Sequence, residues 1–254
     1  MRCAAAAAAA AASAFVLLAG CAGGDGSEEP AADTVTTAGT GDELGSEWEP
    51  KDTPEATSGG LRLEDAQRIL DDARFAEAEL GLTVDEDYDR ESGLHTPTAA
   101  YCSGEGDAVD EHRIARSQRW WANEAWDSGQ PGGYTVGVEV VYYEPGGVTG
   151  TMAVFGAVPD VCPSVGYDSG SSVTYSPGEA PAGLPAGTVA LRDEWVYPSG
   201  QDAPGMMVAI PVGDLIGFLY IRGDQPAVDE HGGELARLLA GNLEKADAEI
   251  QESQ

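Results

Sequence analysis

Residues 22–60 contain no repeating apolar pattern, so the folded part of this chain can begin only near Leu61. The stretch is rich in Gly, Ser, Thr, Ala and Pro, and it holds ten acidic residues against Lys51 alone. Such a segment cannot bury enough apolar surface to offset the entropy lost on ordering it. We therefore expect a disordered acidic tether over residues 21–60, which would span roughly 35 Å as a flexible coil.

The segment before the tether has the pattern of a bacterial export signal. Arg2 is followed by an Ala-rich apolar run, and Leu18-Ala19-Gly20-Cys21 is similar to the lipobox of lipoproteins. We expect residues 1–20 to be a signal peptide and the Cys21 thiol to carry membrane lipid. Two or three acyl chains, such as palmitate, would hold the protein stably on the extracytoplasmic face of the cell membrane. An ordinary signal peptide that happens to end near a cysteine is the alternative.

The charge of the chain excludes some classes of partner. Its 254 residues carry 13 Lys and Arg against 44 Asp and Glu, a formal net charge of −31. A polyanion would repel the phosphates of nucleic acid, so we expect no nucleic-acid partner. Electrostatic binding to anionic lipid is disfavoured for the same reason. Solubility is the simplest reason for the acidity.

Two cysteines, Cys102 and Cys162, lie in the part of the chain that can fold. In an exported protein, two cysteines 60 positions apart most simply form a disulfide. Closing a loop of that length stabilises a fold by about 4 kcal/mol in the chain-entropy model. Two free buried thiols are the alternative, and no Cys-x-x-Cys spacing favours zinc or redox chemistry.

Apolar periodicity from Leu61 onward alternates between helix and strand. The order predicts an α+β fold with a mostly antiparallel sheet, helices packed on one face and one disulfide. We expect the domain to span residues 61–249, with a tail at 250–254. Residues 113–121 are ambiguous between helix and strand. The other expected helices are 66–73, 152–158 and 235–246, and the expected strands are 80–84, 135–143, 173–175, 188–191, 206–210 and 215–221.

Motifs for catalysis or metal binding are weak. Asp168-Ser169-Gly170 matches the nucleophile loop of chymotrypsin-like proteases, but Tyr167 replaces the glycine before it. Asp85, Asp87 and Asp89 alternate like the start of a calcium loop, but Arg90 stands where its glycine is required. The best interpretation is a non-enzymatic protein with no cofactor and no metal.

The three histidines give no clearer signal. His95, His112 and His231 are isolated from one another and lie in polar stretches. None has the spacing of a zinc site, so solvated surface is the simplest interpretation.

One segment, residues 113–126, combines cationic and aromatic side chains. Its Arg forks and flat rings are residue types that bind anions, sugars or partner proteins. We therefore choose Arg116, Arg119, Trp120 and Trp121 as candidate ligand contacts. The alternative is that the tryptophans fill the core while the arginines pair with nearby acids.

The layout from Leu61 onward resembles the PknH-like extracellular sensor domains, which occur behind mycobacterial serine/threonine kinases and in related actinobacterial lipoproteins. The resemblance covers most of residues 61–245. It is carried by the opening helix, by Cys102 after a polar stretch, by Trp120 before the strand at 138–143, by Cys162-Pro163, and by the final hairpin and helix.

This resemblance implies a ligand-sensing module with a cleft beside an antiparallel sheet. Family members have two disulfides, whereas this chain has two cysteines in the domain and can form only one. The expected function is a lipid-anchored protein whose domain binds a small envelope ligand or an envelope protein without catalysis. A secreted cell-envelope hydrolase and a structural envelope component without a ligand are the alternatives.

Overall fold

The computed structural model describes residues 60–80, 82–84, 112–167, 169–200 and 202–254. All of them belong to the larger of two compact units, Val35–Gln254. Cys21, Cys102 and the acidic run at 85–89 lie outside the described residues, so what the sequence suggests for them stays a prediction.

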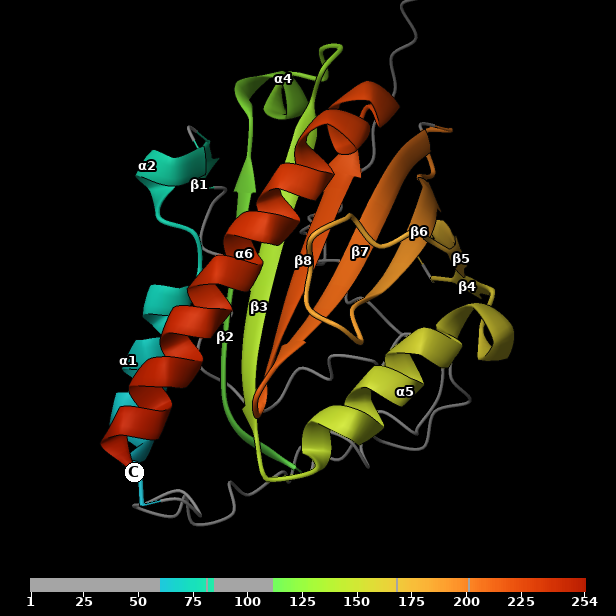
Figure 1. Cartoon of the computed structure of the whole chain (residues 1–254). Helices are drawn as coiled ribbons and strands as arrows, with labels where there is room; N and C mark the ends of the chain where they lie inside the picture. The colour runs from blue at the N-terminus through green and yellow to red at the C-terminus, as the bar shows by residue number, and fades with distance from the viewer. Residues whose placement is uncertain (1–59, 81, 85–111, 168, 201) are drawn as a thin grey trace, which may run out of the picture. The chain divides into compact units, whose positions relative to one another are not determined.

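An eight-stranded antiparallel sheet forms the centre of this unit (Figure 1). The strand order across it is β1-β2-β3-β8-β7-β6-β5-β4. The strands are β1 (Thr83–Val84), β2 (Arg113–Ala122), β3 (Tyr134–Tyr143), β4 (Ser164–Gly166), β5 (Ser172–Pro177), β6 (Val189–Val196), β7 (Asp202–Val212) and β8 (Leu215–Gly223).

The chain reaches the far edge of the sheet and then returns to its centre. After β3, the helix α5 (Gly147–Val161) carries the chain to β4 at that edge. Strands β4 to β8 then come back as consecutive antiparallel neighbours, until β8 pairs with β3. Two distant parts of the sequence therefore meet at the middle of the sheet.

Two helices, α1 (Leu63–Ala73) and α6 (Gln225–Ser253), cover one face of the sheet, which we call the first face. They lie side by side (Figure 1) and share one hydrophobic core with alternate residues of β3, β7 and β8. Leu239 and Leu243 of α6 lie directly over Gly217 of β8, where a Cβ would come within 2.6 Å of the Leu243 side chain. Absence of a side chain at that position therefore sets how closely α6 approaches the sheet.

The helix α5 packs on the opposite face, which we call the second face. Phe155 of α5 meets Phe218 of β8 edge-on, with ring centroids 5.6 Å apart. Successive residues of a strand point to opposite faces, so Phe218 and Gly217 cannot share a side of the sheet. The expectation that all helices pack on one face is therefore wrong, although the α+β class and the antiparallel sheet are confirmed.

Several expected elements are confirmed, with changes in length. The helix at 66–73 is α1, and its four periodic residues are all buried. The ambiguous segment at 113–121 is the strand β2. The final helix begins ten residues earlier than expected and continues through Ser253, with Ile250 buried, so it extends into the expected tail.

Short elements were missed because they carry too few residues for a periodic pattern. They are α2 (Glu77–Leu80), α4 (Glu124–Asp127) and β4. Of the described residues in the expected strand at 80–84, Leu80 ends α2, and Thr83 and Val84 form β1. Within the described part of the chain, no helix is both long and apolar enough to cross a membrane.

Candidate functional site

The alternation of β2 divides the Arg/Trp segment between the two faces. Trp121 is 0% exposed on the first face, where its ring lies 6.1 Å from that of Phe75. Arg119 has the same parity along the strand. Arg116 and Trp120 point to the second face. The structure thus brings together one pair of the candidate contacts and separates it from the other, so all four cannot contact one small ligand.

A buried ion pair lies at the middle of the second face. Arg116 Nε donates to Glu139 Oε1 at 2.5 Å, and the two side chains are 1% and 2% exposed. Arg116 Nη2 also donates to Gln118 Oε1 at 2.6 Å, and the Tyr220 hydroxyl donates to Glu139 Oε2 at 3.0 Å. A buried charge is tolerated only when it is paired and hydrogen-bonded. This network satisfies that condition for both ions.

Trp120 lies flat on the backbone of the neighbouring strand. A Cβ built on Gly137 of β3 would be 2.7 Å from three adjacent carbons of the indole, so one face of the ring rests on this glycine. The ring is also nearly parallel to Tyr220, at 24° with centroids 5.4 Å apart. Trp120 is only half-buried. The ring face that rests on Gly137 is covered, so the exposed part of Trp120 belongs to the rest of the side chain.

A second charged group lies further along the same face. Arg222 of β8 donates from Nε and Nη2 to Asp193 Oδ2 of β6, at 3.0 and 2.7 Å. It reaches across β7 at Gly205, where any Cβ would collide with the Asp193 carboxylate. Trp195 Nε1 donates to the same Asp193 oxygen at 2.9 Å, and the guanidinium lies 4.4 Å from the Trp195 ring centroid. Hydrogen bonds and a cation–π contact thus fix Arg222 in place.

Three half-buried rings continue this arrangement toward the edge of the sheet. Tyr167 stacks on Trp195 with centroids 5.3 Å apart, and Tyr197 lies 6.3 Å from Trp195. Burial raises the pKa of the Tyr167 hydroxyl, while a hydrogen bond with Tyr175 acts in the opposite direction. The rings of Trp120, Trp195, Tyr167 and Tyr197 are the partly exposed aromatic surface of the second face.

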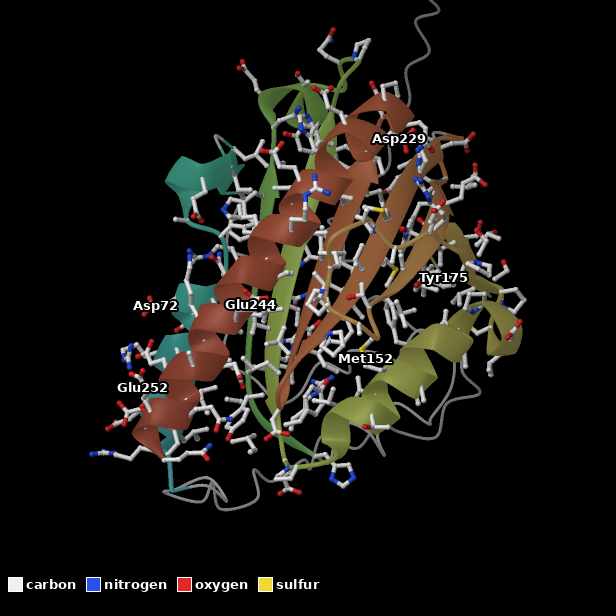
Figure 2. All side chains as sticks on the ribbon, in the orientation of Figure 1. Asp72, Met152, Tyr175, Asp229, Glu244 and Glu252 are labelled. Carbon is white, nitrogen blue, oxygen red and sulfur yellow. The ribbon has the colours of Figure 1, made fainter. Side chains whose placement is uncertain are left out.

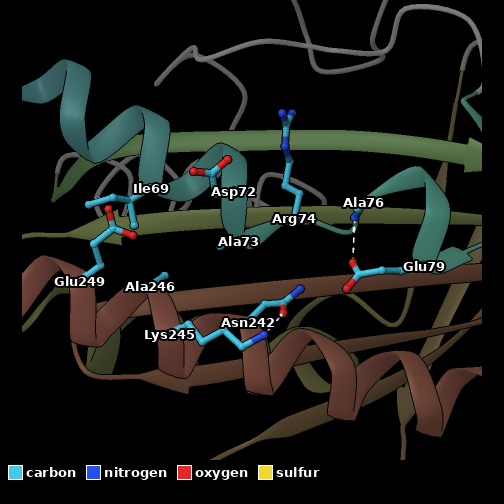
Figure 3. A pocket seen from close by; sticks show the side chains of 10 residues that line it. All are labelled: Ile69, Asp72, Ala73, Arg74, Ala76, Glu79, Asn242, Lys245, Ala246 and Glu249. Carbon is cyan, nitrogen blue, oxygen red and sulfur yellow. Dashed lines mark hydrogen bonds between the residues drawn. The ribbon is translucent and has the colours of Figure 1, made fainter.

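A separate hollow of about 310 Å³ lies between α1 and α6 (Figure 3). Charges of both signs line it, including Arg74, Lys245 and Glu249. Glu249 accepts a 2.8 Å bond from Arg68 of α1, and Lys245 donates to Asn242 at 3.3 Å. The Arg68–Glu249 contact joins the two helices, so we interpret the hollow as part of their junction.

The histidines that the structure describes lie beside other side chains of the fold. His112 is exposed and lies 3.5 Å from a Glu144 oxygen, and His231 stacks on Tyr134. Asp168 and His95 lie outside the described residues. Across the part of the chain that the structure describes, no group of three His, Cys, Asp or Glu could hold a metal ion.

Cys162 is 8% exposed and caps the C-terminal end of α5. Its expected partner, Cys102, lies outside the described residues. The pairing therefore stays a prediction.

Sequence reasoning missed most of the second face. Glu139 was the available signal, because a single carboxylate inside an apolar strand needs a buried partner. Arg222, Asp193 and Trp195 come from two strands, β8 and β6, that are separated in the sheet by β7. Only the register of that sheet brings them together.

Comparisons with known proteins add little to this geometry. No family model matches the chain, and no curated protein matches it. Among solved structures, it is similar to the extracellular domain of PknH from Mycobacterium tuberculosis, with 12% identity and a TM-score of 0.44. The match covers 70% of this chain and 96% of that one. Similarity at this level carries no argument about family or function.

Proposed function

We propose that this chain is a lipoprotein anchored through Cys21 to the extracytoplasmic face of the cell membrane. Its folded domain binds a small envelope ligand or an envelope protein, and it does so without catalysis. The support for the anchor is the sequence pattern that ends at Cys21. A disulfide between Cys102 and Cys162 belongs to the same proposal, because an exported domain matures in an oxidising compartment.

The second face is the binding surface in this proposal, and its partly exposed rings are the observation that carries it. α5 covers this face around Phe155 and Val158, whereas Trp120, Trp195 and Tyr167 remain half-buried beyond it. Trp, Tyr and Arg are the residue types that contribute most to binding when their rings are held rigidly. Here the rings are fixed by Gly137, Asp193 and their own stacking.

The first face offers less for recognition. Its apolar side chains are covered by α1 and α6. The outer side of these helices carries acidic residues, among them Asp72, Glu244 and Glu252 (Figure 2). We therefore assign binding to the second face.

Thermal unfolding in the presence of separated envelope fractions tests this function. The full chain, purified in detergent, is mixed with lipid, glycan and protein fractions of the envelope. A ligand that binds only the folded state raises the unfolding temperature, because stability rises with ligand concentration above Kd. We expect one fraction to raise it for the wild type and not for the Trp120→Ala/Trp195→Ala double variant.

Trp126→Ala is the matched control, since this half-buried tryptophan belongs to α4 and not to the second face. It should keep the response. A response that survives in the double variant, or no response to any fraction, would contradict binding at the second face.

A further inference from the structure

We infer that the second face takes an uncharged carbohydrate, with Trp120 as the platform on which a sugar ring stacks. This inference rests on the proposed function and names the class of ligand. The contact with Gly137 fixes the orientation of the indole and covers one of its faces, while the residue as a whole stays half-buried.

The charges around the platform disfavour an anionic ligand. The second face holds three arginines among the described residues, namely Arg113, which is 5% exposed opposite Tyr143, Arg116 and Arg222. Arg116 and Arg222 are each bonded to a carboxylate of the same face, Glu139 or Asp193, at 2.5 and 2.7 Å. These carboxylates would repel an anion at the surface, and the net charge of −31 would repel it from a distance.

Polar and aromatic groups on the same face as the platform match the rim of a sugar. A pyranose ring has an apolar C–H face that packs on an aromatic ring, while its hydroxyls need both donors and acceptors. Trp120 supplies the apolar surface. Arg222, 16% exposed on its side chain, and the rim of Trp195 supply polar and aromatic contacts on the same side of the sheet.

A wholly apolar ligand would form no hydrogen bonds with the polar groups of the second face. The polar network would then be desolvated without new hydrogen bonds, which costs free energy. A sugar combines the apolar face and the hydroxyl groups that the surface can satisfy.

Neutral trisaccharides test the inference directly. The full chain is purified in a zwitterionic detergent without a sugar headgroup and titrated with maltotriose, cellotriose, mannotriose and chitotriose. Tryptophan fluorescence and saturation-transfer NMR report binding. We expect at least one of these probes to bind with a Kd of about 1 mM or tighter. The anionic trisaccharide sialyllactose should bind about tenfold more weakly than that probe.

Two different variants should remove this binding. Trp120→Ala deletes the platform, and Gly137→Ala lifts it, because the new Cβ would lie 2.7 Å from the ring carbons. Each variant should weaken the affinity for that probe about tenfold or more, as expected for a central aromatic contact. Trp120→Phe keeps a ring and should retain part of the affinity, while Trp126→Ala should leave it unchanged. Far-UV circular dichroism checks that each variant folds.

The outcomes separate this inference from the function on which it rests. The carbohydrate assignment is overturned if none of the four probes binds, if Trp120→Ala and Gly137→Ala keep wild-type affinity, or if sialyllactose binds more tightly than the neutral probes. A thermal response to an envelope protein or lipid fraction, lost in the Trp120→Ala/Trp195→Ala variant, would then leave the proposed function standing. Failure of both experiments would remove both.

Discussion

At the scale of single residues, Glu139 holds the centre of the second face together. Its carboxylate accepts from Arg116 and from the Tyr220 hydroxyl, and almost none of it is exposed to water. Removing one partner of a buried ion pair leaves the other charge uncompensated, and that loss exceeds the net stability of the intact pair. Neutralising Glu139 therefore affects folding more than any exposed acid would.

We predict that Glu139→Gln lowers the free energy of unfolding by about 3–5 kcal/mol. Urea denaturation followed by circular dichroism measures the change. The control is Glu144→Gln, since Glu144 is 54% exposed and faces His112 across 3.5 Å. An exposed pair of this kind contributes about 1 kcal/mol or less. Equal losses in the two variants would show that the Arg116–Glu139 pair is not effectively buried.

The sequence predicted that Arg and Trp side chains matter at this site, but not which of them lie on the same face of the sheet. The sequence alone selected Arg116, Arg119, Trp120 and Trp121 because cations and rings are concentrated there. A helix would have spread these side chains around its axis, whereas a strand separates neighbours to opposite sides. Trp121 could be assigned to the core and Trp120 to the second face only once β2 was known to be a strand.

At the scale of elements, one glycine sets how α6 lies on the sheet. Leu239 and Leu243 occupy the space above Gly217, and both leucines are fully buried. A close-packed core resists even one added methyl group, because side chains must leave their preferred rotamers to admit it. The position of α6 therefore depends on the absence of a side chain on β8.

We expect Gly217→Ala to destabilise the domain by about 1–3 kcal/mol, since its methyl group would come within 2.6 Å of Leu243. Gly241→Ala is the matched control on α6. Its Cβ would meet nothing within 4 Å, so it should stabilise the helix by about 0.5–1 kcal/mol. Thermal unfolding of both variants measures these opposite signs. A neutral or stabilising Gly217→Ala would show that the helix can move away at no cost.

Long periodic elements were predictable, and the layer to which each belongs was less so. α1, β3, α5, the β7–β8 hairpin and α6 all carry patterns that the sequence makes plain. The face that α5 covers depends on the chain leaving the centre of the sheet after β3 and re-entering at the far edge with β4. β4 has only three residues, too few for any pattern, and missing it concealed this path.

At the scale of the whole molecule, charge and chemistry agree on where binding is possible. The chain is a polyanion with a formal charge of −31, and acidic residues such as Glu244 and Glu252 lie on the outer side of α6. On the second face, by contrast, Arg116 and Arg222 are balanced by carboxylates. A neutral ligand meets the least electrostatic repulsion at that face.

Location decides which ligands such a surface could meet. An envelope ligand is available only if the domain works outside the cytoplasm, and the proposed disulfide between Cys102 and Cys162 requires the same oxidising environment. Both conditions depend on export, and the proposed attachment of lipid to Cys21 would keep the exported domain at the membrane. The proposed location of the domain therefore depends on export and on lipid attachment at Cys21.

Mass spectrometry of the N-terminal peptide from native, membrane-extracted protein tests this claim most directly. We predict a chain that begins at Cys21, with a diacylglyceryl group on its sulfur, found in the membrane fraction. A peptide that contains residues 1–20 joined to an unmodified Cys21, recovered from the cytosol, would contradict the account.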